Sequence, residues 1–161
     1  MKSNDDYGIP PMVRQGELIA EIGGLLVDEF GDDWLELRLD VRTLGPKWEE
    51  EAFIKRRSLD TVRVLPQTMM GRQQKELRKV TATPEGGAWF SMSLTVTPDH
   101  RATAKFDYDT EPAWHRGPAY KSYLSELKRF PRSEENMPPW FRQRMEEKRL
   151  ESLRRAAEEE E

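Results

Sequence analysis

Three carboxylates in one short stretch are the residues of this sequence best placed to do chemistry. Asp107, Asp109 and Glu111 occupy alternate positions in FDYDTEPAW, residues 106–114. Two of them could work as general acid and base, because alternate strand residues lie ~6.5–7 Å apart and paired glycosidase carboxylates lie about 5–9.5 Å apart. They could instead bind a metal, dock a protein partner, or form the solvated face of a strand. The alternation itself favours a solvated strand face.

Few other residues could complete a catalytic site. The chain has no cysteine and two histidines, His100 and His115, so cysteine nucleophiles, disulfides and thiolate metal sites are excluded. Nucleophile elbows, glycine-rich phosphate loops and H-E-x-x-H motifs do not occur. We therefore expect a protein that is not an enzyme and has neither catalytic residues nor a cofactor. One alternative stays open, a small enzyme or ligand-binding domain that uses Asp107, Asp109 and Glu111.

A metal site is not expected either. The stretch DYDTEPAW lacks the central glycine and the distal glutamate that an EF-hand loop needs to bind calcium. The two histidines cannot form a zinc site by themselves. The sequence therefore predicts no metal ligands.

Charge and hydropathy narrow the class of partner. The chain carries 26 basic and 30 acidic residues, a net charge of −4, so it has no global attraction to nucleic acid or to an anionic membrane. Basic clusters at 55–57 and 75–79 are typical of solvated faces, and no nucleic-acid motif occurs. Neither a membrane span nor a signal peptide is indicated. We expect a cytoplasmic protein that binds neither nucleic acid nor membrane.

A protein partner is the remaining expectation. A row of carboxylates beside an aromatic side chain can engage lysine or arginine on another protein, with the charges steering encounter and the aromatic supplying binding energy. Trp114 is the aromatic residue that ends this stretch. The reading favoured slightly over this one is a core anchor that closes the end of the sheet.

The elements that would position these residues form a hairpin. Apolar residues alternate with polar ones over 90–96 and again over 102–108, and TPDHR between them predicts the turn. This register places Asp107 and Asp109 on the face opposite Phe106 and Tyr108.

The rest of the chain alternates between helical and strand patterns. Helical periodicity over 15–29 surrounds Gly23-Gly24, which indicates close packing or a bend. Period-two alternation over 35–41 predicts a strand before a turn at Gly45-Pro46, and a second strand is expected near 51–58. Further helices are expected over 67–80, opened by Pro66, over 118–130, and from Pro139 onward.

These patterns predict an α+β fold. We expect a single antiparallel β-sheet with helices packed on one face, including an N-terminal helix and C-terminal helices. The predicted organisation is a flexible leader over 1–13, one domain over 14–153, and a charged, frayed tail over 154–161. No internal repeat occurs.

A resemblance sharpens the functional expectation. WFSMSLTVTPDHRATAKFDYDTEPAW (89–114) and YKSYLSELKRFPRSEENMPPWFRQRM (120–145) resemble the YezG-like group of immunity proteins, especially its actinobacterial members. That group carries an F-[DN]-Y-[DN]-x-E-P-x-W signature, then a Y-x-x-[DE]-L-x-x-[FY]-P-R element and a P-x-W turn. The resemblance covers roughly 18–145, but the 48–65 segment and the charged end of the chain match nothing specific.

The resemblance implies an antitoxin. Proteins of this group bind the C-terminal domain of a cognate secreted polymorphic toxin in the cytoplasm and block it. Such toxins are often nucleases with basic active faces, which an acidic partner suits. On this hypothesis Asp107, Asp109, Glu111 and Trp114 form the toxin-binding site. A regulatory interaction module without a toxin is a further alternative, and the sequence leaves the toxin's chemistry and the oligomeric state open.

Overall fold

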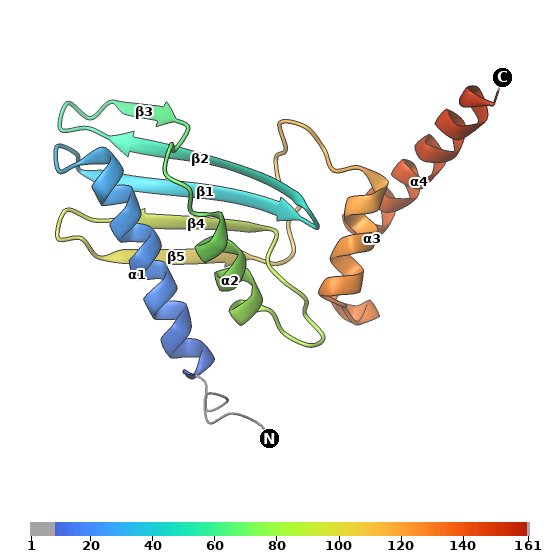
Figure 1. Cartoon of the computed structure of the whole chain (residues 1–161), viewed down its shortest axis with the longest axis horizontal. Helices are drawn as coiled ribbons and strands as arrows, with labels where there is room; N and C mark the ends of the chain where they lie inside the picture. The colour runs from blue at the N-terminus through green and yellow to red at the C-terminus, as the bar shows by residue number, and fades with distance from the viewer. Residues whose placement is uncertain (1–8, 161) are drawn as a thin grey trace. The chain divides into compact units, whose positions relative to one another are not determined.

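The computed structural model describes residues 9–160 and has the α+β architecture expected from the sequence. Its five strands form one antiparallel sheet in the order β3-β2-β1-β4-β5 (Figure 1). The elements in chain order are α1 (Pro11–Phe30), β1 (Glu36–Leu44), β2 (Lys47–Lys55), β3 (Thr61–Val64), α2 (Gly71–Thr81), β4 (Ser91–Val96), β5 (Ala102–Asp107), α3 (Tyr120–Arg129), the 3₁₀ helix η2 (Glu134–Asn136) and α4 (Pro139–Glu159).

The chain divides into two compact units. The first comprises the residues up to 39, 51–81 and 94–104, and the second comprises 40–50, 82–93 and the residues from 105 onward. Four of the strands have one end in the first unit and the other end in the second unit, namely β1, β2, β4 and β5. The division therefore falls inside the strands, whereas the sequence suggested one domain over 14–153 and no linker.

In the first unit, α1 and α2 lie side by side over one face of the strands (Figure 1). The alternation read from the sequence is confirmed in β1 and β4, because Leu37, Leu39, Leu94 and Val96 are buried while the residues between them are only half-buried. Burying one face of each strand fixes the register, since a slip by one residue would expose the whole apolar set.

Gly23 explains how closely α1 approaches the sheet. A Cβ atom at position 23 would lie 2.7 Å from the Cβ of Ala102 and 3.5 Å from a methyl carbon of Val96, whereas one at Gly24 would meet nothing within 4 Å. Close packing at Gly23 is therefore confirmed. Gly24 has no comparable neighbour.

The strand predicted near 51–58 overlaps β2, which forms a hairpin with a further strand, β3, that the sequence did not predict. Strand β2 runs from Lys47 to Lys55 and pairs with β3 in the register Phe53↔Arg63. The turn between them includes Leu59 in a left-handed conformation with φ of 70°. Charged residues on both faces of this hairpin hid its period from the sequence. One of them, Glu51, forms an ion pair with Arg63 at 2.5 Å.

Two helix starts differ from the sequence expectation. Helix α1 begins at Pro11, within the predicted leader, because proline is tolerated in a first turn where its missing N–H needs no partner. Helix α2 begins at Gly71 rather than near Gln67. Glu29 accepts hydrogen bonds from the backbone N–H groups of Gln67 at 2.7 Å and Thr68 at 2.5 Å, which holds that segment outside the helix. Residues 1–8 of the leader lie outside the described part.

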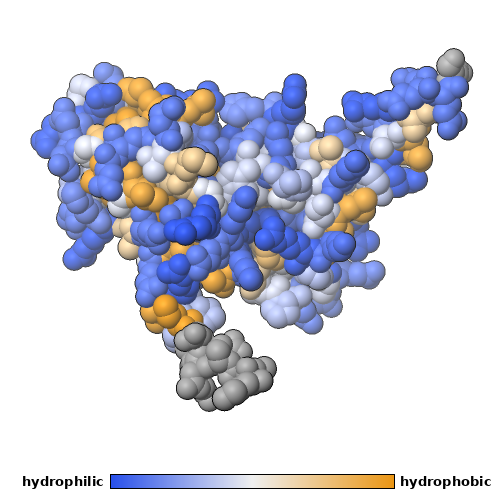
Figure 2. Space-filling model, viewed as in Figure 1, coloured by the Kyte–Doolittle hydropathy of each residue, from blue (hydrophilic) through white to orange (hydrophobic). Residues whose placement is uncertain are grey.

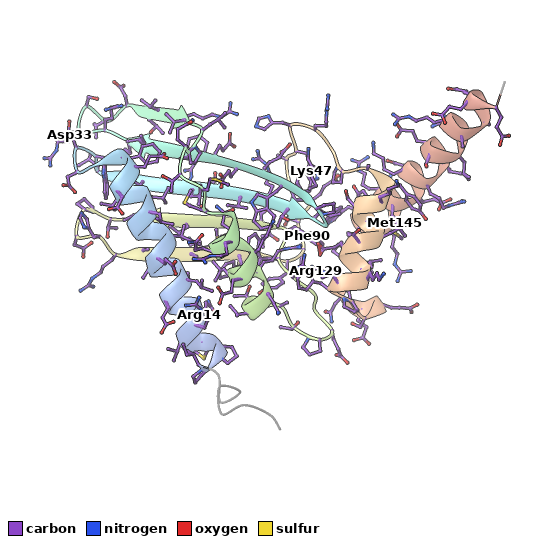
Figure 3. All side chains as sticks on the ribbon, viewed as in Figure 1. Arg14, Asp33, Lys47, Phe90, Arg129 and Met145 are labelled. Carbon is purple, nitrogen blue, oxygen red and sulfur yellow. The ribbon has the colours of Figure 1, made fainter. Side chains whose placement is uncertain are left out.

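The second unit has its own core beside α3 and α4. Leu44, Phe90, Tyr123 and Phe141 form a buried cluster, and Phe90 appears in Figure 3 at the end of the strands nearest these helices. Glu126 of α3 is buried and accepts a 2.9 Å hydrogen bond from the N–H of Gly45. Residues 154–159, expected as a frayed tail, continue α4 as helix.

Candidate binding site at residues 107–114

Asp107 ends strand β5 and turns the chain. Its Oδ1 accepts hydrogen bonds from the backbone N–H groups of Asp109 at 3.0 Å and Thr110 at 2.9 Å. A carboxylate that bonds the backbone two and three residues ahead mimics a turn and competes with the strand ladder. The predicted row of outward carboxylates therefore stops at Asp107, and Asp109 lies in the bend that follows β5.

The same hydrogen bonds keep Asp107 ionised. Partial burial raises the pKa of its carboxyl, but the backbone N–H groups of Thr110 and Asp109 outweigh burial, so the pKa lies below its ordinary value. A general acid at neutral pH needs the opposite shift. The geometry thus gives Asp107 the role of a structural acceptor.

Asp109 presents its carboxylate to solvent. Its backbone oxygen accepts a 2.6 Å hydrogen bond from the indole Nε1 of Trp140, at the start of α4. The residue itself is exposed. Within residues 9–160 no ion pair engages its carboxylate, so Asp109 is a fixed backbone position that carries an available charge.

Glu111 is tied to α4. Its Oε1 lies 2.8 Å from Nε of Arg144, whose Nη1 also contacts Glu147 at 3.1 Å. Arg144 donates hydrogen bonds to both carboxylates, and these bonds raise the pKa of its guanidinium above the ordinary value. The bond to Glu111 is the larger cause and the bond to Glu147 the second. Pro112, the next residue, is buried. Glu111 therefore lies at an exposed rim but is oriented by its own chain.

Trp114 supports the alternative reading of a core anchor. Its ring is half-buried and packs against the cluster that contains Phe90 and Phe141. The indole Nε1 is enclosed and makes no hydrogen bond to the described residues. A largely enclosed ring gives Trp114 packing energy within this chain rather than a free contact surface.

Glu49 of β2 holds the far end of the segment. Its two carboxylate oxygens accept hydrogen bonds from the backbone N–H groups of His115 at 2.9 Å and Arg116 at 3.1 Å. Burial raises the pKa of the Glu49 carboxyl. The two backbone hydrogen bonds and the charge of Lys47 lower it by more than burial raises it, so the pKa lies below its ordinary value. The segment is thus fixed at Asp107, at Asp109 and beyond Trp114.

Sequence reasoning missed three of the residues that shape this site, Glu49, Trp140 and Arg144. Trp140 was expected to reach a core, which its edge-to-face contact with Phe90 at 5.0 Å confirms. Its hydrogen bond to Asp109 joins residues 31 positions apart, so no local spacing could reveal it. The one feature of the sequence that pointed to Trp140 was the P-x-W turn of the resemblance.

The two histidines have different surroundings. His100 belongs to the first unit. Its Nε2 lies 3.1 Å from Asp32, and its ring stacks on Trp34. His115 follows Trp114 and is exposed. In the described part of the chain, no group of three or more histidine, aspartate or glutamate side chains is arranged to hold a metal. Across residues 9–160, no helix is long and apolar enough to cross a membrane.

Comparison with known proteins adds no assignment. Neither the models of known protein families nor the curated proteins gave a match to this chain. The function is therefore argued from the geometry of the 107–114 segment and from the signature that it carries.

Proposed function

We propose that this protein is an immunity protein, an antitoxin that neutralises a cognate secreted toxin domain in the cytoplasm by stoichiometric binding. The observation that carries the proposal is a preorganised acidic loop. Asp107 locks the turn, Trp140 holds the backbone of Asp109, and Arg144 orients Glu111. A surface that is rigid before binding loses less conformational entropy when a partner docks.

The proposal divides the predicted site residues by role. Asp109 and Glu111 are the contact residues, because their carboxylates lie at or near solvent. Asp107 and Trp114 are positioning residues, since their polar and aromatic groups are engaged within the chain. The partner that fits such a loop is a basic protein face, such as the phosphate-binding face of a nuclease toxin, because fixed negative charge steers encounter with positive charge.

The enzyme alternative is less well supported by this geometry. A paired-acid mechanism needs one carboxyl group with a raised pKa and one without. Asp107 has a lowered pKa, and Glu111 is held by Arg144. A lowered pKa disfavours proton donation by Asp107.

The first experiment is direct. The chain and the toxin domain encoded by the neighbouring upstream gene are purified separately, mixed and titrated by calorimetry, and the chain is tested for protection of cells that express the toxin. We expect a 1:1 complex and protection. A pair that neither binds nor protects would contradict the proposal, as would turnover of a substrate by the chain alone that is lost in Asp109→Asn.

Asp109→Lys tests the contact role. We expect the association rate with the toxin to fall by about tenfold or more, because reversing an exposed charge alters steering, and we expect the rate to depend less on salt. Glu158→Lys is the matched control, since it makes the same charge change on exposed α4 about 27 Å along the helix from Trp140. Equal rates for both variants would place the contact elsewhere.

A further inference from the structure

The second half of helix α4 carries an apolar stripe that residues 9–160 leave exposed. Phe141 is the one buried residue of α4 in the described structure, while Leu150 and Leu153 are 47% and 55% exposed. Figure 1 shows the second half of α4 extending past α3. Figure 2 shows hydrophobic residues on the surface of this half of the helix. Two exposed leucines therefore lie one turn apart on the same face of the helix, where a further helix could cover them.

This half of α4 is stabilised as a helix by its own charges. Arg149 lies 2.6 Å from Glu146 and Arg155 lies 2.8 Å from Glu151, at the i,i+3 and i,i+4 spacings that support an exposed helix. Lys148 adds a third pair with Glu151 at 3.3 Å. The stripe is therefore presented on a formed helix and needs no folding step before it docks.

The stripe has the spacing of a short coiled-coil seam. Leu150, Leu153 and Ala157 follow one another at intervals of three and four residues, and together with Glu147 and Arg154 they line one shallow hollow. In heptad terms Leu150 and Ala157 occupy a, Leu153 occupies d, and Glu147 and Arg154 both occupy e. A seam of this length fits one further helix.

The charges beside the seam select the partner and its direction. In an antiparallel pair of two α4 helices centred between Leu150 and Leu153, each Leu150 packs on Leu153 of the second copy. The e positions then face one another, so Glu147 meets Arg154 of the second copy, and two-fold symmetry makes this pair twice. A parallel pair would instead place Arg149 against Arg154 of the second copy, which is repulsive.

We propose that the chain self-associates through an antiparallel contact between the α4 helices of two copies, built on Leu150 and Leu153 and flanked by Glu147–Arg154 pairs. The seam is short, so the buried area falls below the ~1,200 Å² of a standard stable interface, and the dimer is weak and concentration-dependent. This inference does not rest on the proposed antitoxin function, because it concerns a different partner and the exposed leucines of α4. The two surfaces adjoin at Glu147, which also contacts Arg144 at 3.1 Å.

Sedimentation velocity over a concentration series, with the whole chain and no toxin, tests the contact. We expect the weight-average mass to rise with concentration, and we expect Leu153→Asp to abolish the rise. Ser152→Asp is the matched control, since it adds the same charge to the adjacent outward position and should leave self-association unchanged. A chain that stays monomeric throughout, or a dimer that Leu153→Asp leaves intact, would overturn the proposal.

Charge exchange tests the direction. Arg154→Glu should weaken self-association by about tenfold, because it sets glutamate against Glu147 of the second copy twice. Glu147→Arg combined with Arg154→Glu should restore it. In a parallel pair Arg154→Glu would instead strengthen association by meeting Arg149, and that result would contradict the antiparallel contact. Circular dichroism of each variant shows that the helix content is retained.

Discussion

At the scale of single residues, the structure separates charges that hold the chain from charges that face solvent. Asp107 and Glu49 both accept backbone N–H groups and both have lowered pKa values. Asp109 sits two residues from Asp107 with its carboxylate exposed. Their spacing in the sequence is regular, but the hydrogen bonds assign them different roles.

Asp107→Ala should lower the free energy of unfolding by about 1–2 kcal/mol at pH 7, because two backbone donors lose a charged acceptor at a half-buried position. Asp109→Ala, which removes an exposed carboxylate of the same size, should change stability by less than about 0.5 kcal/mol. Urea denaturation followed by circular dichroism measures both. Equal effects from the two variants would mean that the turn does not depend on Asp107.

The same residue gives a pH dependence with a definite sign. The folded pKa of Asp107 is lowered below its ordinary value of 3.8, so its contribution is present above that value and is lost as pH falls through the folded pKa. The stability difference between wild type and Asp107→Ala should therefore shrink between pH 5 and the acid limit. Denaturation curves collected at stepped pH check this, and a gap that widened in acid would give the wrong sign.

At the scale of elements, the fit of α1 on the sheet depends on one glycine of a pair. Gly23→Ala should destabilise the protein by about 1–3 kcal/mol, because the new methyl group would overlap Ala102 on a strand that cannot move aside. Gly24→Ala should leave the free energy of unfolding unchanged or raise it by up to about 1 kcal/mol, because alanine has a higher helix propensity than glycine. Thermal melts of the two variants compare the effects directly, and matching shifts would place α1 farther from β5.

At the scale of the whole molecule, the two compact units share four strands. Strands that run through both units link their unfolding, so we expect one cooperative transition. Leu39→Ala in the first unit and Phe141→Ala in the second, both fully buried, should each cost about 2–5 kcal/mol and shift that same transition.

Two spectroscopic probes test whether the two units unfold in one transition. Tryptophan fluorescence and far-ultraviolet circular dichroism should give coincident curves for both variants. Leu124→Ala is the control, because this leucine of α3 is 46% exposed and its truncation should cost little. A biphasic curve for either core variant would show that the units unfold separately.

The sequence by itself determined the fold class and much of the sheet. Period-two alternation placed β1, β4 and β5, the Gly45-Pro46 turn separated β1 from β2, and the glycine pair in α1 marked a close approach. These features are readable because burial of one face imposes a local period on the residue types. The signature at 106–114 also came from sequence alone and motivated the proposed function.

Only the tertiary structure decided which residues of that signature are held by distant parts of the chain. The partners of the segment are Trp140, Arg144 and Glu49, which lie 31 to 67 positions away in sequence from the residues that they bind. The start of α2 was decided in the same way, by Glu29 reaching Thr68 across 39 positions. Local spacing reports which face of an element is buried, whereas packing of distant elements decides which charge is paired and which stays in solvent. That difference is why the carboxylate row was visible in the sequence and its division into charges engaged within the chain and charges left in solvent was not.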